Sequence, residues 1–179
     1  MILKNREMKL SPFILFVLLV SCEDMQTSIT FNEFTDDRDG QTYATVEIGD
    51  KTWMAENLNY SPQGSDYLQT DKYGILYPFN TAVTICPDGW RLPTDEEWGE
   101  LIEYYPDDVA LRTSDFKAEL GGWVNGGNYF GVNRIGAWWT GTDYQDGYAW
   151  VYYIKADSDV TRISQPKSSM MAVRCIKDY

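Results

Sequence analysis

The chemistry open to this chain is limited by its composition, because the sequence contains three cysteines and no histidine. Without an imidazole, Ser-His-Asp and Cys-His catalysis, the common zinc sites and the usual proton shuttle near neutral pH are excluded. Carboxylates remain, and two suitably spaced acids suffice for glycoside hydrolysis. The sequence alone does not pair such acids, so we expect no catalytic residues, no metal and no cofactor.

The first cysteine, Cys22, ends a segment typical of an export signal. Basic residues at positions 4, 6 and 9 precede an apolar run over residues 13–20, which is too short to span a bilayer. The end of this segment, Leu19-Val20-Ser21-Cys22, resembles the bacterial lipobox, in which the cysteine is diacylated and becomes the new N-terminus. We therefore predict a signal peptide over residues 1–21 and a lipid on Cys22. The alternative is an ordinary secretory signal that ends in a cysteine.

A lipid at this position predicts an outer-membrane lipoprotein of the cell envelope, with the membrane as a partner. Acidic Glu23-Asp24 follow the cysteine and are similar to tags that direct Bacteroidetes-like lipoproteins to the cell surface, although a solvated tether is an equal alternative. Residues 22–35 lack sustained periodicity and are predicted to be a tether. Residues 36–179 have a length that suits one domain.

The charge balance argues against a nucleic-acid partner. The whole chain carries a net charge of −12, and removal of residues 1–21 takes away three positive charges and one negative charge, which leaves −14. An acidic surface repels phosphates and anionic headgroups.

The other two cysteines, Cys86 and Cys175, are expected to pair, because leftover thiols in one small exported domain usually form a disulfide. The alternative is two buried thiols.

Local patterns predict hairpins, helices and loops. Alternating residues 44–48 and the Gly49-Asp50 turn predict a β-hairpin with residues 51–55. Thr94 and Glu97 form a capping-box pattern for a helix that ends near Pro106, and the apolar positions of this helix lie on one face. The remaining elements are a second short helix over residues 114–120 and strands over residues 149–154, 160–163 and 170–176. Together they predict an α+β domain with two short helices, β-hairpins and long loops.

The segment Asp36-Asp37-Arg38-Asp39-Gly40 invites comparison with an EF-hand calcium loop. Aligned to such a loop, it places Val46 where a bidentate glutamate is needed. A solvated turn is the favoured interpretation.

Residues 121–148 are rich in glycine, asparagine, tryptophan and tyrosine, and are predicted to be long, structured loops. Aromatic rings beside amides and acids suit sugar binding, because rings stack on sugar faces while polar groups orient hydroxyls. The alternative for each large aromatic is core packing. The candidate ligand-binding residues are Trp123, Asn125, Asn128, Tyr129, Trp139, Asp143 and Tyr144.

Several segments carry a family likeness. They are Asp37-Arg38-Asp39-Gly40-Gln41-Thr42-Tyr43, Thr45-Val46-Glu47-Ile48-Gly49, Trp53-Met54-Ala55-Glu56-Asn57-Leu58-Asn59-Tyr60, Cys86-Pro87-Asp88-Gly89-Trp90-Arg91-Leu92-Pro93-Thr94-Asp95-Glu96-Glu97-Trp98 and Val173-Arg174-Cys175. In this order, from about Asp36 to Cys175, the chain resembles the Fibrobacter succinogenes major paralogous domain.

The resemblance implies a C-type-lectin-like fold related to formylglycine-generating domains, and it implies no catalytic residue set. The chain has no spare cysteine pair for an oxidase of that kind. It also contains none of the Glu-Pro-Asn, Gln-Pro-Asp and Trp-Asn-Asp triplets of calcium-dependent lectins. Gln165-Pro166 matches the start of one triplet, but Lys167 follows and puts a cation where a ligand oxygen is needed.

These observations favour a membrane-anchored, non-catalytic binding module of the cell envelope, with glycans as the first candidate ligand. The second hypothesis is a protein-interaction or assembly module that uses the same loops to bind an envelope protein. The third is a carboxylate-dependent enzyme acting on glycans.

The lipid prediction is tested on the protein purified from its native membranes. Mass spectrometry of the mature N-terminus is expected to find an acylated Cys22 and no residues before it. A mature N-terminus with an unmodified Cys22 would contradict the prediction.

Overall fold

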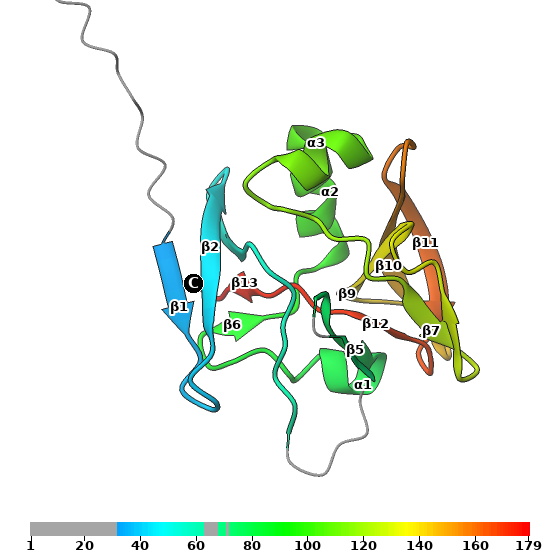
Figure 1. The fold of residues 1–179 in the computed structure, drawn as a ribbon, viewed down its shortest axis with the longest axis horizontal. Helices are drawn as coiled ribbons and strands as arrows, with labels where there is room; N and C mark the ends of the chain where they lie inside the picture. The colour runs from blue at the N-terminus through cyan, green and yellow to red at the C-terminus, as the bar shows by residue number, and fades with distance from the viewer. Residues whose placement is uncertain (1–31, 63–67, 71) are drawn as a thin grey trace, which may run out of the picture. The chain divides into compact units, whose positions relative to one another are not determined.

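Two β-sheets and three short helices make up the part of the chain that the computed structural model describes, which is residues 32–62, 68–70 and 72–179. In Figure 1 the strands of the smaller sheet lie on the left, β10 and β11 lie on the right, and α2 and α3 lie between them at the top. The predicted signal peptide, the predicted lipidation site Cys22 and the predicted tether up to residue 31 lie outside the described residues. The fold is mixed α+β, as the sequence predicts.

The smaller sheet has the strand order β1-β2-β3-β13-β6. Its centre is the predicted hairpin, in which Gly49 takes a φ of +64° at the turn and Ile48 pairs with Lys51. Asn32–Thr35 were predicted to be tether and instead form a strand against the hairpin. The strands are β1 (Asn32–Thr35), β2 (Thr42–Ile48), β3 (Lys51–Met54), β6 (Trp90–Arg91) and β13 (Ile176–Lys177).

The larger sheet has the order β11-β10-β9-β12-β5-β4, with a β7–β8 pair joined to β12. The prediction of loops over residues 121–148 is wrong, because three strands lie there and one of them is 11 residues long. The strands are β4 (Leu68–Thr70), β5 (Gly74–Pro78), β7 (Trp123–Asn125), β8 (Asn128–Phe130), β9 (Ile135–Gln145), β10 (Tyr148–Lys155), β11 (Thr161–Pro166) and β12 (Met170–Ala172).

The helices are α1 (Phe79–Ala82), α2 (Asp95–Tyr104) and α3 (Asp108–Thr113). The capping box of α2 is confirmed, since Thr94 and Glu97 bond to each other's backbone N–H groups. The second predicted helix, over residues 114–120, is wrong. Asp107 caps a helix that starts earlier, and that helix ends before Ser114. Among the described residues no helix has the length and apolar character needed to cross a bilayer.

The core lies on both faces of the larger sheet. Trp138 and Trp139 are neighbours on β9, and their side chains enter different buried clusters because successive strand residues point to opposite faces. On the Trp138 face, α2 inserts Trp98, whose ring stacks on Tyr152 at a centroid distance of 5.4 Å and meets Trp53 edge-on. The buried face of α2 therefore packs against residues of both sheets.

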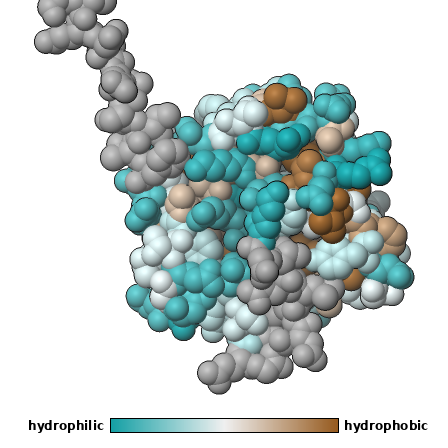
Figure 2. Space-filling view, in the orientation of Figure 1, coloured by the Kyte–Doolittle hydropathy of each residue, from teal (hydrophilic) through white to brown (hydrophobic). Residues whose placement is uncertain are grey.

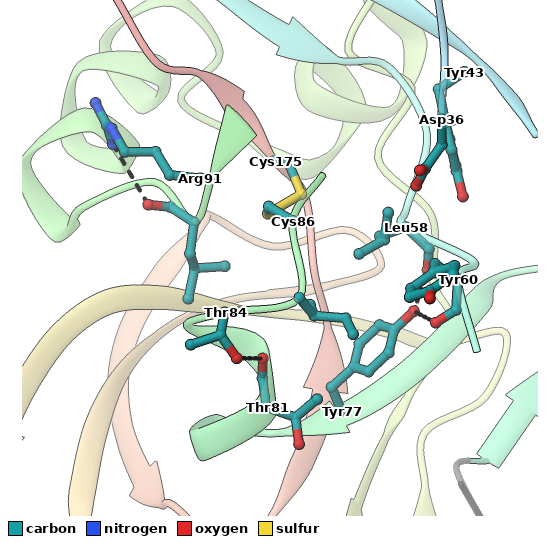
Figure 3. The surroundings of a disulfide bond; sticks show 12 residues. Asp36, Tyr43, Leu58, Tyr60, Tyr77, Thr81, Thr84, Cys86, Arg91 and Cys175 are labelled. Atoms are coloured by element: carbon teal, nitrogen blue, oxygen red, sulfur yellow. Dashed lines mark hydrogen bonds between the residues drawn. A yellow bond between two sulfur atoms is a disulfide. The ribbon is translucent and has the colours of Figure 1, made fainter. Parts of the chain in front are cut away.

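The predicted disulfide between Cys86 and Cys175 is present. Figure 3 shows this bond and its surroundings, which include Tyr77, whose hydroxyl donates to the carbonyl oxygen of Tyr60 at 2.8 Å. The bond joins the segment before β6 to the chain that leads into β13.

The last predicted strand, over residues 170–176, is divided in two. Residues 173–175 pass from β12 in the larger sheet to β13 in the smaller sheet. Their backbone carbonyls still accept hydrogen bonds, from Leu58 at Val173 and from Met54 at Cys175. This crossing segment is thus held by the chain that follows the first hairpin.

The middle residue of the crossing segment, Arg174, is completely buried. Its guanidinium donates to the carbonyl oxygens of Met54 and Phe116 and to Oδ1 of Asn57. The same Asn57 oxygen accepts from Nε1 of Trp138 on β9. Burial lowers the pKa of Arg174 to about 9, so the group keeps its charge at neutral pH.

We predict that Arg174→Met lowers the free energy of unfolding by about 3 kcal/mol, because it leaves buried carbonyl oxygens without donors. The measurement is urea unfolding followed by tryptophan fluorescence with the disulfide intact. Arg134→Met, at an exposed arginine, is the matched control and should change stability by less than about 0.5 kcal/mol. Equal effects of the two substitutions would contradict the role given to Arg174.

Candidate functional site

Four of the candidate ligand-binding residues lie on one small antiparallel pair, β7 and β8, here called the ribbon. A two-residue turn at Gly126 and Gly127, both with positive φ, joins the two strands. The register pairs Trp123 with Phe130 and Asn125 with Asn128. Because side chains alternate along a strand and face the same way in a cross-strand pair, these four side chains share one face.

The ribbon face combines an aromatic platform with amides. The rings of Trp123 and Phe130 lie 5.2 Å apart at 31°. Trp123 is half-buried against the core, whereas Phe130 is 43% exposed. Asn128 donates to the Gly126 carbonyl oxygen at 3.3 Å, and its amide is exposed to solvent. Sequence reasoning missed Phe130, although alternation across the Gly-Gly turn pairs it with Trp123.

Tyr129 lies on the opposite face of the ribbon, in register with buried Val124. The residue is 39% exposed, and its partial burial raises the pKa of its hydroxyl, so the group is a neutral phenol at neutral pH. Tyr129 thus belongs to the ribbon without contributing to the Trp123 platform.

Trp139 must be removed from the candidates. Its side chain is 0% exposed, its Nε1 donates to the Tyr77 carbonyl oxygen at 2.8 Å, and its ring meets Phe79 edge-on. The residue lies in a central strand with a packed layer on each side, so it has no face for a ligand.

Asp143 and Tyr144 lie near the far end of β9, on a different strand pair from the ribbon. Asp143 forms an ion pair with Lys167 at 2.9 Å, and both side chains are partly in solvent. The exposed ring of Tyr144 packs edge-on against Trp150 at 4.4 Å, while Arg162 covers the face of Trp150 at 3.5 Å. The contacts of Asp143 and Tyr144 are therefore with neighbouring side chains near the turn between β9 and β10, and not with the ribbon.

Apolar residues gather on the right of the face shown in Figure 2, on the side where β7 and β10 lie in Figure 1, while hydrophilic residues cover the left. Exposed Phe130 and Val132 follow each other closely in this part of the chain. On the face shown, apolar residues are therefore more frequent on this side, where they lie among hydrophilic ones.

A second candidate site is a polar pocket of about 180 Å³ beside β2, here called the polar pocket. It lies between the first hairpin and the chain before β7. The side chains that carry its chemistry are those of Gln41, Tyr43, Glu56, Asn59, Lys72 and Glu119.

The acids of the polar pocket differ in their surroundings. Glu56 is exposed and accepts a hydrogen bond from the Ala44 N–H at 2.9 Å. Glu119 is half-buried, and burial raises its pKa from the ordinary value of 4.5, with a further contribution from Glu56. The charges of Arg174 and Lys72 act in the opposite direction but do not cancel this rise.

The acidic turn compared above with a calcium loop is occupied by internal bonds. Buried Asp36 binds the guanidinium of Arg38 with both oxygens, and Asp39 accepts from the Gln41 N–H. Within the described residues no group of three or more His, Cys, Asp or Glu side chains is arranged to hold a metal ion. The turn therefore has the hydrogen bonds of a structural loop.

The fold and these two surfaces define an α+β domain that presents an aromatic ribbon and a polar pocket. Residues 46–113, from β2 to the end of α3, match the model of the Fibrobacter succinogenes major domain, the family that the sequence resembles. Comparison with curated proteins and with solved structures gave no match.

The raised pKa of Glu119 leads to a prediction about stability. Between pH 4.5 and its folded-state pKa, the native protein binds more protons at Glu119 than the unfolded chain does, so this residue lowers stability as the pH rises through that range. Glu119→Gln removes the effect. We expect the variant to be more stable than the wild type at pH 7, by up to about 1 kcal/mol because the group is half in solvent.

This gain should disappear below about pH 4, where Glu119 is protonated in both states. The measurement is urea unfolding at both pH values, with exposed Glu47→Gln as the control. A Glu119→Gln variant less stable than the wild type at pH 7 would contradict the assignment.

Proposed function

We propose that this protein is a non-catalytic binding module, and that the ribbon face binds glycans. The observation that carries the proposal is the register of β7 and β8, which puts two aromatic rings and two amides on one partly exposed face. An apolar sugar face can stack on Phe130, while Asn125 and Asn128 each offer a donor and an acceptor to sugar hydroxyls.

The charge of the site favours neutral glycans. None of the four side chains on the ribbon face is ionisable, and the chain carries a net charge of −12. Acidic polysaccharides would be repelled by the surrounding field, whereas neutral sugars would not. The edge of the ribbon is open at β8, which pairs only with β7 among the described strands, so no further described strand covers this edge.

The proposal includes a setting and a finer fold class. We place the domain in the outer membrane of the cell envelope, anchored through a lipid on Cys22, and we propose that its architecture is lectin-like and related to formylglycine-generating domains. Support comes from the disulfide, which suits an oxidising compartment, and from the C-terminal strand, which returns to the first hairpin through the pairing of Ile176 with Trp53.

A protein-interaction module is the second candidate function. The observation that favours it is the run of exposed apolar side chains at Tyr129, Phe130 and Val132 beside an open strand edge. A partner could add a strand to β8 and cover these side chains.

The glycan proposal is tested with the purified full-length protein in detergent on an array of neutral and acidic glycans. We expect binding to neutral glycans, weakened roughly tenfold by Phe130→Ala and by Asn128→Ala, because each removes one contact of the ribbon face. Tyr148→Ala, at an aromatic of similar exposure outside the ribbon, is the control and should leave binding unchanged.

Absence of glycan binding, or binding that these ribbon substitutions do not weaken, would contradict the proposal. Pull-down of one envelope protein that is lost in Phe130→Ala, together with a blank glycan array, would favour the second candidate.

A further inference from the structure

We propose that the polar pocket beside β2 is a separate binding site for a polyol, such as a single sugar ring recognised through its vicinal hydroxyls. The site goes beyond the function proposed for the ribbon, because it shares no residue with that face.

The first argument is that the Glu119 carboxylate is half-buried without a hydrogen-bond partner among the described residues. The described residues also supply no ion pair to it, although the charges of Lys72 and Arg174 act on it from a distance. A carboxylate in such a place costs stability, and an amide of the same shape would not. A ligand that donates hydrogen bonds to the carboxylate would offset the cost.

The second argument is an unused acceptor in the same pocket. Oδ1 of Asn59 is buried and accepts no hydrogen bond, while the backbone N–H of Asn59 donates to the Tyr43 hydroxyl. Buried polar atoms are nearly always satisfied, so an orphaned oxygen that belongs to a pocket-lining residue points to a donor from outside the chain.

The third argument selects the class of ligand. Besides the acceptors on Glu56, Glu119 and Asn59, the pocket has a donor on the Lys72 ammonium, whereas Nε2 of Gln41 already donates to Asp39 and to the Asn59 carbonyl oxygen. Each hydroxyl both donates and accepts one or more hydrogen bonds, so neighbouring hydroxyls match a mixed lining, whereas a metal ion or an ammonium group would use the acceptors alone. The volume of about 180 Å³ is below that of pockets for drug-sized ligands, which suits one small ring.

The test uses the full-length protein in detergent and four probes: D-glucose, D-galactose, D-mannose and myo-inositol. Isothermal titration calorimetry should show saturable binding of at least one probe. Glu119→Gln and Asn59→Ala should each weaken it roughly tenfold, because each removes one acceptor for a ligand hydroxyl from the lining of the pocket. Exposed Glu47→Gln is the matched control and should bind like the wild type.

Phe130→Ala separates this proposal from that of the ribbon. Probe binding that survives Phe130→Ala and is weakened by Glu119→Gln supports the polar pocket, whatever the glycan array shows. Binding lost in Phe130→Ala alone would place the sugar on the ribbon and overturn this inference. No saturable binding of any of the four probes would also overturn it.

Discussion

The guanidinium of Arg174 is buried where the chain crosses from the larger sheet to the smaller one, and it bonds to backbone carbonyls of β3 and of the loop after α3. Its side-chain partner, Asn57, connects it to Trp138 in the larger sheet. A buried charge must be satisfied from several directions at once, so the position of each of these segments depends on the others. The disulfide one residue later fixes the same crossing segment covalently.

This constraint reaches both candidate sites. The loop after α3 that supplies carbonyls to Arg174 continues directly to Glu119 in the polar pocket and then to β7 of the ribbon. On the other side of Arg174, the chain after β3 carries Glu56 and Asn59, which line the pocket. The buried cation therefore sets the distance between the two walls of the polar pocket and the point from which the ribbon starts.

Features that depend on a few neighbouring residues could be predicted from the sequence. The Gly49-Asp50 hairpin, the Thr94 capping box and the Cys86–Cys175 bond are of this kind, since each follows from local spacing or from counting thiols. The helix over 114–120 was wrong because Asp107 competes as a cap, and because the carbonyl of Phe116 is needed by Arg174, 58 residues away. A local sequence pattern does not show this long-range hydrogen bond to the Phe116 carbonyl oxygen.

Only part of the candidate site could be predicted, because the rest also depends on contacts between distant segments. Glycine and asparagine around Trp123 and Trp139 suggested loops, yet β9 runs through the centre of a sheet with packing on both faces, and Trp139 is buried there. Composition does not show which tryptophan lies in a central strand and which lies at an edge. The polar pocket was missed altogether, because Glu56 and Glu119 are 63 positions apart in the sequence and only the fold brings them together.

The edge position of β1 bears on how the domain meets its surroundings. β1 is the outermost strand of the smaller sheet and receives the N-terminal chain, whereas the ribbon belongs to the other sheet, and Figure 1 shows β1 and β7 on opposite sides of the molecule. A domain held by its N-terminal chain would thus be attached on the side opposite its aromatic ribbon, which would leave the ribbon free to meet a ligand.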